Sequence, residues 1–196
     1  MNIKVIGIDL AKLTFQVCAL KNNGKLLFNK KVSRKNLLST IRQLDTDAFI
    51  AMESCSTCHY WGRLFEEMGF TVRLVPPQHV KPFVKVQKND ANDALAICEA
   101  ALRPNIHFVQ VKSTRQQDLC SLHKVRQSTI QQRTAQANKL RAQAGEYGVV
   151  FNQSVSQLLK QVSCALENAD NGLTIIARRI LRRMYEQLKQ LNCEIN

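Results

Sequence analysis

The 196-residue sequence has no long hydrophobic run, no regular framework of cysteines and no low-complexity segment. No apolar stretch approaches the ~20 residues that a membrane helix needs. The first residues contain no long apolar segment and no small-residue cleavage site, so we expect no signal peptide, a cytoplasmic location and no membrane partner. The seven cysteines are then expected to be reduced thiols. These absences exclude a membrane protein and a disulfide-stapled secreted domain.

What the sequence does contain is enough apolar material for a core, together with an excess of positive charge. A length of 196 residues is enough for one domain and an appendage, and hydrophobic residues make up 45% of the chain, which is enough for a packed core. The formal net charge of +13 favours a polyanionic partner, most simply nucleic acid. Residues 103–141 hold eight basic residues and a single acid, Asp118. Basic solvated helices are common in soluble proteins, so charge alone leaves a purely structural role open.

The spacing of apolar residues predicts an α/β part followed by an all-helical part. Strands are expected at 3–11, 14–20, 26–32, 48–54 and 71–76, and helices at 34–44, 60–68 and 90–103. Three turn-linked antiparallel strands, followed by strands with crossover helices, predict a mixed sheet of ribonuclease H type with flanking helices. Segment 107–111 is either an edge strand or an extended linker. Beyond it, helices are expected at 113–144, 154–166 and 173–191, so we place the domain boundary between 111 and 112.

The stretch "AMESCSTCHYW" at 51–61 contains Cys55, Cys58 and His59 in the order C-x-x-C-H. Haem attachment through this string typically needs an oxidising compartment, and a zinc site needs four ligands, of which no second pair is present. A redox pair is a further possibility, because a helix N-terminus lowers a thiol pKa. The simpler interpretation is a set of small, half-buried residues that begin a helix.

Four carboxylates point to a different chemistry. Asp9 ends the first predicted strand and Glu53 ends the fourth, and sites in such sheets gather at the carboxyl ends of strands. Asp90 and Asp93 are spaced to share one helix face. Four carboxylates suffice to hold two divalent ions, as in-line phosphodiester displacement requires, and oxygen ligands suit Mg²⁺ or Mn²⁺. Each acid also has a structural interpretation, because Asp9 can cap a turn and acids are favoured in the first turn of a helix.

The long helix predicted from Ser113 combines a hydrophobic seam with basic residues. At heptad spacing the seam consists of Leu119, His123, Arg126, Ile130, Arg133, Ala137, Leu140 and Ala144. Its ends suit a coiled coil, whereas the two arginines occupy positions that a coiled coil keeps apolar. They either extend outward or pair with a neighbour, or they face phosphates. We expect nucleic-acid contacts from Lys112, Arg115, Lys124, Arg126, Arg133, Lys139 and Arg141.

Five stretches together resemble the DEDD-type insertion-sequence transposases, a family that includes the Piv-type DNA invertases and has an N-terminal RuvC-like domain. They are "GIDLAK" at 7–12, "MESCSTCHYW" at 52–61, "RLVPPQHVKPFVK" at 73–85, "KNDANDALAI" at 88–97 and "FVQVKSTRQQDLCSLHKVR" at 108–126. The resemblance extends to about Phe151. It implies that Asp9, Glu53, Asp90 and Asp93 are the acidic tetrad of a RuvC-like domain, and that the C-x-x-C-H string is a coincidence. It also implies recombination of DNA at element ends and targets, guided by a structured RNA and carried out by dimers or tetramers.

One departure from the family pattern limits what the resemblance implies. Full-length relatives have a second domain after the helices, with a serine that attacks DNA, and no residue before Asn196 matches that serine. We therefore expect either part of a longer protein or a truncated gene product. Two alternatives stay open: a stand-alone RuvC-like junction nuclease, and a non-catalytic remnant that binds nucleic acid. A sugar-kinase or actin-like ATPase is disfavoured, because that fold needs a second phosphate loop and a longer chain.

Overall fold

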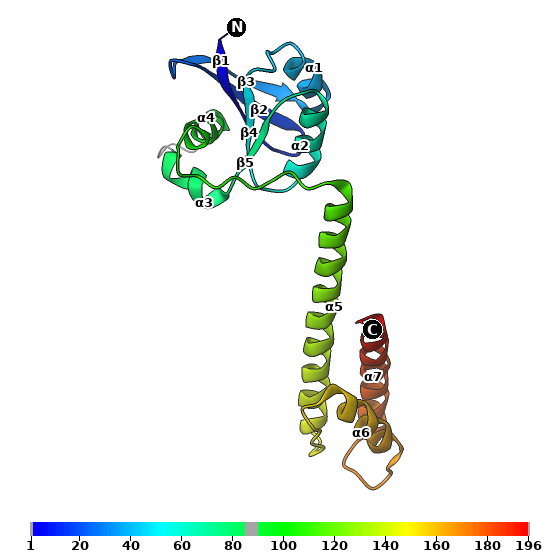
Figure 1. Cartoon of the computed structure of the whole chain (residues 1–196). Helices are drawn as coiled ribbons and strands as arrows, with labels where there is room; N and C mark the ends of the chain where they lie inside the picture. Colours follow the sequence, from blue (N-terminus) through cyan, green and yellow to red (C-terminus); the bar gives the residue numbers. More distant parts are fainter. Residues whose placement is uncertain (1, 85–89, 196) are drawn as a thin grey trace. The chain divides into compact units, whose positions relative to one another are not determined.

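The computed structural model describes residues 2–84 and 90–195. The chain divides into two compact units, Met1–Gln116 and Gln117–Asn196, whose elements are labelled in Figure 1. The division falls within the first turn of the long helix, a few residues beyond the predicted boundary at 111/112. The functions predicted for the two parts stay predictions.

The first unit contains a five-stranded mixed sheet with helices on both faces (Figure 1). The strands are β1 (Ile3–Asp9), β2 (Thr14–Lys21), β3 (Leu26–Ser33), β4 (Phe49–Glu53) and β5 (Val72–Val75). Their order in the sheet is β3-β2-β1-β4-β5, with β1 antiparallel to β2 and parallel to β4. This arrangement confirms the predicted sheet of ribonuclease H type.

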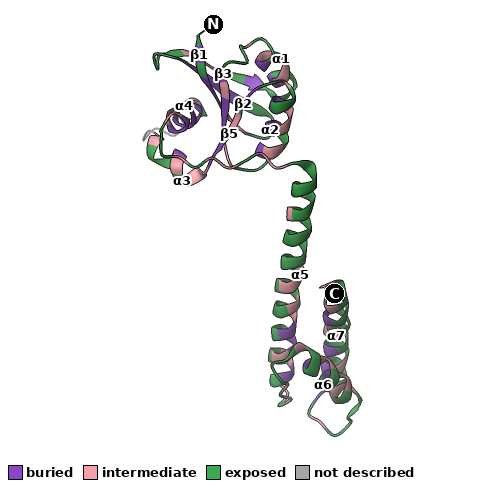
Figure 2. Cartoon of the chain, viewed as in Figure 1, coloured by how far each residue is buried: buried purple, intermediate pink, exposed green. Residues whose placement is uncertain are grey.

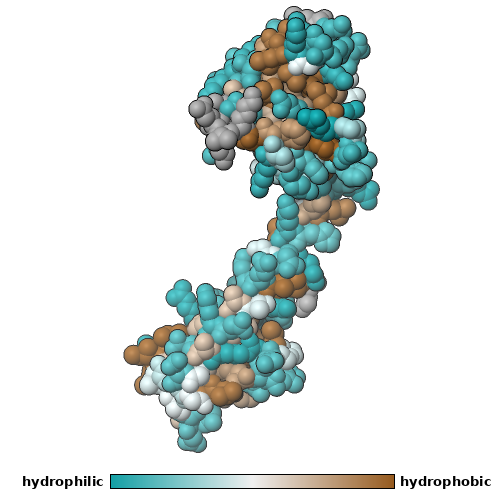
Figure 3. Space-filling view, turned by 90° about the vertical axis from the view of Figure 1, so that its left-hand side faces the viewer, coloured by the Kyte–Doolittle hydropathy of each residue, from teal (hydrophilic) through white to brown (hydrophobic). Residues whose placement is uncertain are grey.

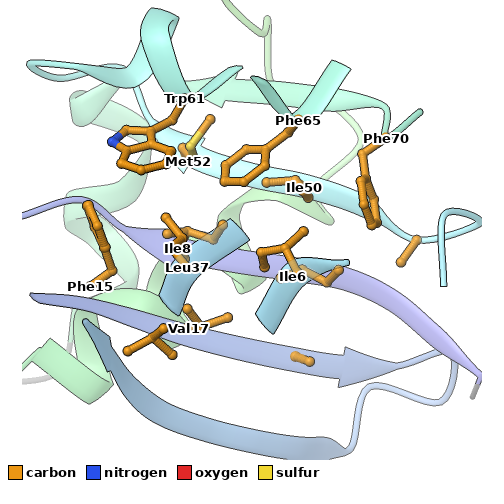
Figure 4. Close-up of a cluster of buried hydrophobic side chains, with 14 of the residues drawn as sticks. Ile6, Ile8, Phe15, Val17, Leu37, Ile50, Met52, Trp61, Phe65 and Phe70 are labelled. Carbon is orange, nitrogen blue, oxygen red and sulfur yellow. The ribbon is translucent and has the colours of Figure 1, made fainter. Parts of the chain in front are cut away.

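One face of the sheet packs against α1 (Leu37–Ile41) and α2 (Cys58–Glu67). Alternate residues of each strand, such as Ile6 and Ile8 of β1, point into this core because side chains in a strand alternate between faces. Figure 4 shows them opposite the aromatic rings of α2. The Trp61 ring meets Phe15 edge-on, with 5.1 Å between the ring centroids, an arrangement that aromatic pairs prefer.

The other face packs against α4 (Asp90–Ala101), whose inner side is buried (Figure 2). Its buried residues are mostly small, with Ile97 as the one large side chain. The close approach depends on Gly7 in β1. A Cβ atom at this position would collide with Cys98 Sγ and would lie 2.7 Å from the Ala94 carbonyl oxygen. Glycine therefore allows α4 to lie directly on β1, next to the strand end that carries Asp9.

Two local features differ from the sequence prediction, and a third, which the sequence left open between two alternatives, is decided. The helix predicted at 34–44 is shorter, a 3-10 turn at Arg34–Asn36 followed by α1. The predicted pattern missed α3 (Pro77–Val80) and a second 3-10 turn (Lys81–Phe83), because elements of four and three residues are too short to show a helical period. Segment 107–111 is an extended linker with a single bridge, in which the Val109 N–H donates to the Leu74 carbonyl at 2.8 Å.

The second unit is helical, as predicted. It contains most of α5 (Thr114–Gly145), together with α6 (Val155–Glu167) and α7 (Ile175–Ile195). The buried residues of α5 are Ala137, Leu140 and Ala144, which pack against α6 and α7 through residues such as Leu158 and Leu181. Figure 3 shows a mostly hydrophilic surface with separate hydrophobic patches on this unit. Among the described helices, none has the length and apolarity needed to cross a membrane. A coiled coil through α5 stays a prediction.

Candidate active site

The carboxyl ends of β1 and β4 bring two predicted acids together. The strands are parallel neighbours, with Ile8 paired to Met52. The next residue on each strand is an acid, Asp9 on β1 and Glu53 on β4, and both are partly exposed. Because paired residues point to the same face of a sheet, both side chains lie on the face that α4 covers.

The same level of the sheet continues as a polar row across β2 and β3. Asp9 pairs with Gln16 of β2, and Gln16 pairs with Lys31 of β3. Residues directly opposite each other in an antiparallel pair have Cβ atoms about 4.5–5.5 Å apart on one face. Lys31, Gln16, Asp9 and Glu53 therefore form a row at one edge of the α4 face. Gln16 and Lys31 were not predicted as neighbours of the acids, because one sequence gives no register between strands.

The helix α4 adds the remaining acids, but in different positions. Asp93 lines a cavity of about 260 Å³ together with Asp9 and Glu53. The rest of its lining comes from Pro77, Val80, Lys81 and Val84. Asp90 is not part of this lining. Its carboxylate pairs with Lys31 Nζ at 3.1 Å, and both side chains are largely exposed. Three of the four predicted acids thus face one cavity, and the fourth lies beside it.

The electrostatics show that three of the acids act on the fourth, Asp9. The pKa of Asp9 is raised from 3.8 to about 6, first by burial and then by the negative charges of Asp93, Asp90 and Glu53. Each of these influences disfavours the ionised form of the Asp9 carboxyl group. The site therefore favours the uptake of a proton or a cation.

The donor atoms around the cavity fit Mg²⁺ or Mn²⁺. Among the described residues of the lining, the metal-binding side chains are carboxylates, with no thiol or imidazole, and such oxygen donors suit hard cations. Within the described residues, no three His, Cys, Asp or Glu side chains are positioned to hold one ion together. The chemistry of the donor set fits a divalent cation, whereas a complete ligand cage is not formed.

The C-x-x-C-H string has a structural role in this unit. Cys58 is buried at the start of α2, and burial raises the pKa of both thiols, that of Cys55 to about 11. With raised pKa values both thiols stay protonated at neutral pH, unlike reactive thiolates. His59 Nδ1 accepts a hydrogen bond from the Lys112 N–H at 3.2 Å, and Arg63 Nη1 donates to the Lys112 carbonyl at 2.8 Å. The histidine and arginine of α2 thus anchor the linker that precedes α5.

The predicted nucleic-acid-binding residues fall into two groups. Four are exposed, namely Arg115, Lys124, Arg126 and Lys139. The other three, Lys112, Arg133 and Arg141, are partly buried. The two arginines donate side-chain hydrogen bonds within the protein, whereas Lys112 is held through its backbone, as described above. Arg133 Nη1 donates to Asn192 Oδ1 of α7 at 3.2 Å. Arg141 Nε donates to the Asn152 carbonyl at 2.9 Å. Arg133 thus bonds to a neighbouring helix through a neutral asparagine, and its contact with phosphates stays a prediction.

Parts of two matched stretches, Lys85 of the third and Lys88 and Asn89 of the fourth, lie outside the described residues. The structure therefore bears on these stretches only through residues 73–84 and 90–97.

Comparison with known proteins identifies the family. A family model described as a transposase, of the DEDD type named for IS110, matches residues 6–148. The chain is 38% identical over 187 residues to the "Transposase for insertion sequence element IS1111A" of Coxiella burnetii, covering 95% of this chain and 51% of the relative. It is 39% identical over 198 residues to the "Probable family 20 transposase" of Pseudomonas aeruginosa, covering 100% of this chain and 58% of the relative. The chain thus spans little more than half the length of these curated relatives.

Among solved structures, the chain is similar to "T. thermophilus RuvC in complex with Holliday junction substrate", with a TM-score of 0.40 at 15% identity. That alignment covers 54% of this chain and 98% of the other. The sequence relatives and the family model agree over most of the chain. It belongs to the IS110-type DEDD family of transposases.

Proposed function

We propose that this chain supplies the metal-dependent acidic site of a DNA transposase, with Asp9, Glu53 and Asp93 holding a divalent cation and Asp90 as the fourth carboxylate. The observation that supports it most is the shared cavity. Carboxylates from the ends of two parallel strands and from the first turn of α4 line one space of about 260 Å³. Burial and three neighbouring negative charges make the ionised form of Asp9 costly, and a bound cation would offset that cost.

The residues around the cavity are suited to catalysis on a phosphodiester. A bound Mg²⁺ or Mn²⁺ would stabilise the charge that develops on the attacking and leaving oxygens. The rigid strands β1 and β4 fix Asp9 and Glu53 relative to each other. Lys81 lines the same cavity and offers a positive charge to a non-bridging phosphate oxygen. Binding a cation requires the three carboxylates to turn toward a common point, since no complete cage is formed without it.

A metal titration tests this proposal directly. We expect the chain to bind Mn²⁺, followed by electron paramagnetic resonance, and we expect Asp9→Asn or Glu53→Gln to weaken this binding at least tenfold. Glu66→Gln, an exposed carboxylate on α2, is the matched control and should leave the affinity unchanged. Equal Mn²⁺ affinity in all variants would contradict the metal site.

A second test concerns the reaction. We propose that the acidic site acts on DNA ends and targets, guided by a structured RNA and within a dimer or tetramer, as the family resemblance implies. Labelled branched DNA is incubated with the chain and Mg²⁺, with Asp9→Asn as control. Cleavage by this chain alone would favour the stand-alone nuclease. Binding of DNA without cleavage, together with Mn²⁺ binding at the acids, is expected if the relatives' additional length is needed for the reaction. DNA binding with no metal binding would favour the non-catalytic remnant.

A further inference from the structure

We infer that Asn29 and Gln16 are positioning residues of the acidic site. Their side chains form a relay of hydrogen bonds that runs from β2 through β3 to the first turn of α4. The relay ends at Ala91, which lies between Asp90 and Asp93. This inference rests on the proposed function of the site, and nothing in the sequence motifs pointed to either residue.

The direction of the relay is fixed by its last member. The Ala91 carbonyl oxygen can only accept, so Asn29 Nδ2 must donate to it, at 2.8 Å. The other atom of that amide, Asn29 Oδ1, must then accept, and Gln16 Nε2 donates to it at 2.6 Å. A planar amide with both ends engaged holds a single orientation. The relay therefore determines where the first turn of α4 lies relative to β3.

The start of the relay lies beside the acids. Gln16 pairs directly with Asp9 in the register of β1 and β2, so the two side chains are neighbours on the α4 face. The relay thus joins the strand next to Asp9 to the helical turn that carries Asp93. The exposed ion pair between Lys31 and Asp90 attaches the same turn to β3 a second time. Of the acids that line the cavity, Asp93 stands on the turn that this network holds, and Asp9 stands on β1, the strand paired with β2.

The burial of a polar side chain at Gln16 indicates that this residue does more than fill space. The residue is only 5% exposed, and its Oε1 atom has no hydrogen-bond partner in the described part of the chain. An unsatisfied buried acceptor costs about 1–3 kcal/mol, and an apolar residue of similar size would avoid that cost. We attribute the presence of Gln16, despite this cost, to its Nε2 group, which donates to Asn29 Oδ1 and orients that residue.

The experiment compares Asn29→Ala and Gln16→Met with Asn22→Ala in the full chain. Asn22 is the matched control, because its amide also donates to another side chain, Asn2 Oδ1 at 3.1 Å, but on the exposed surface. Three quantities are measured: Mn²⁺ affinity, hydrogen exchange of the α4 amides from Ala94 to Ala96 without metal, and thermal stability. Gln16→Met keeps the side-chain volume, so it serves if Asn29→Ala does not fold.

We expect Asn29→Ala to weaken Mn²⁺ binding about tenfold, within the range seen when groups behind metal ligands are removed. We expect faster exchange in the first turns of α4 in both relay variants, with neither change in Asn22→Ala. Lower thermal stability with unchanged Mn²⁺ affinity and unchanged exchange in α4 would overturn the inference, because the relay would then only stabilise the fold. Wild-type protein that binds no Mn²⁺ would refute the metal site, and the exchange rates alone would then decide whether the relay holds α4.

Discussion

At the scale of single residues, the site depends on one small residue and one acid on the same strand. Gly7 has no side chain, so α4 approaches β1 closely enough for its first turn to reach the strand end. Asp9, two residues later, is the acid on which burial and three other carboxylates act. Close packing and charge repulsion are therefore both built into β1, and each can be tested by one substitution.

Gly7→Ala should destabilise the first unit by about 1–3 kcal/mol, the usual cost of overpacking a core. The new Cβ would press on the Ala94 carbonyl, which is helix backbone, so α4 must move away. Urea unfolding followed by the fluorescence of Trp61, the single tryptophan, measures the loss. Adding Cys98→Ala should restore only part of the stability, because the collision with Ala94 remains. An unchanged unfolding midpoint would show that α4 does not depend on this glycine.

Asp9→Asn should make the metal-free protein more stable at pH 7.5. The folded-state pKa of Asp9 is about 6, above the ordinary value of 3.8, so the folded state binds the extra proton between these values. Stability from this group is present below pH 4 and is lost as the pH rises through 6. Unfolding in EDTA at pH 4 and pH 7.5 checks the prediction. The variant should exceed the wild type at pH 7.5 and match it near pH 4, and a constant difference would contradict it.

At the scale of elements, the start of α5 is fixed by two reciprocal hydrogen bonds. Ser113 Oγ accepts from the Gln116 N–H at 3.2 Å, and Gln116 Oε1 accepts from the Ser113 N–H at 2.9 Å. This is a capping box, which satisfies two backbone donors that the helix cannot pair itself. Ser113 also directly follows Lys112, which His59 and Arg63 anchor to α2. The N-cap residue Ser113 is thus held by Gln116 on one side and by the anchored Lys112 on the other.

Ser113→Ala should cost about 1 kcal/mol of helix stability at this end, because an N-cap side chain is lost. We expect faster hydrogen exchange for the amides of Gln116 and Gln117, measured by mass spectrometry on short peptides. Ser121→Ala is the matched control. Its hydroxyl bonds back to the Gln117 carbonyl within the helix, a contact that contributes no stability. Equal exchange in the two variants would show that the cap is not needed.

The elements themselves were largely predictable, because strand alternation and helical period are local signals. The strands and the longer helices appear where the apolar pattern placed them, and Gly69 ends α2 with a positive φ of 90°. The relay of Gln16 and Asn29 was not predictable. Both look like ordinary polar residues on a strand, and their meaning depends on register across three strands. Asp90 was expected among the cavity acids, but its side chain faces Lys31, a partner 59 positions away that sequence spacing cannot supply.

At the scale of the whole molecule, the excess of basic residues has more than one use. Some of it is internal: Arg178 donates to the carbonyls of Ala165 and Leu166, the last turn of α6. Arg133 and Arg141 are similarly engaged. What remains for a polyanion are exposed side chains on α5, such as Lys124 and Arg126. We propose that these contact phosphates, whereas the bonded arginines stabilise the helical unit.

Lys124→Ala combined with Arg126→Ala should therefore weaken the binding of duplex DNA and structured RNA across sequences. Neutralising phosphates releases counterions, so the logarithm of affinity falls linearly with the logarithm of salt concentration. Each phosphate contact that is lost should flatten this slope by about one unit. Fluorescence anisotropy at four salt concentrations measures affinity and slope together.

Lys21→Ala combined with Lys25→Ala removes the same charge from the exposed β2–β3 turn and is the matched control. Arg133→Ala should instead lower the thermal stability of the helical unit, since it breaks the bond to Asn192. Identical slopes for the α5 variant and the wild type would assign α5 to assembly alone, and would move the phosphate contacts to exposed arginines of α7 such as Arg182 and Arg183.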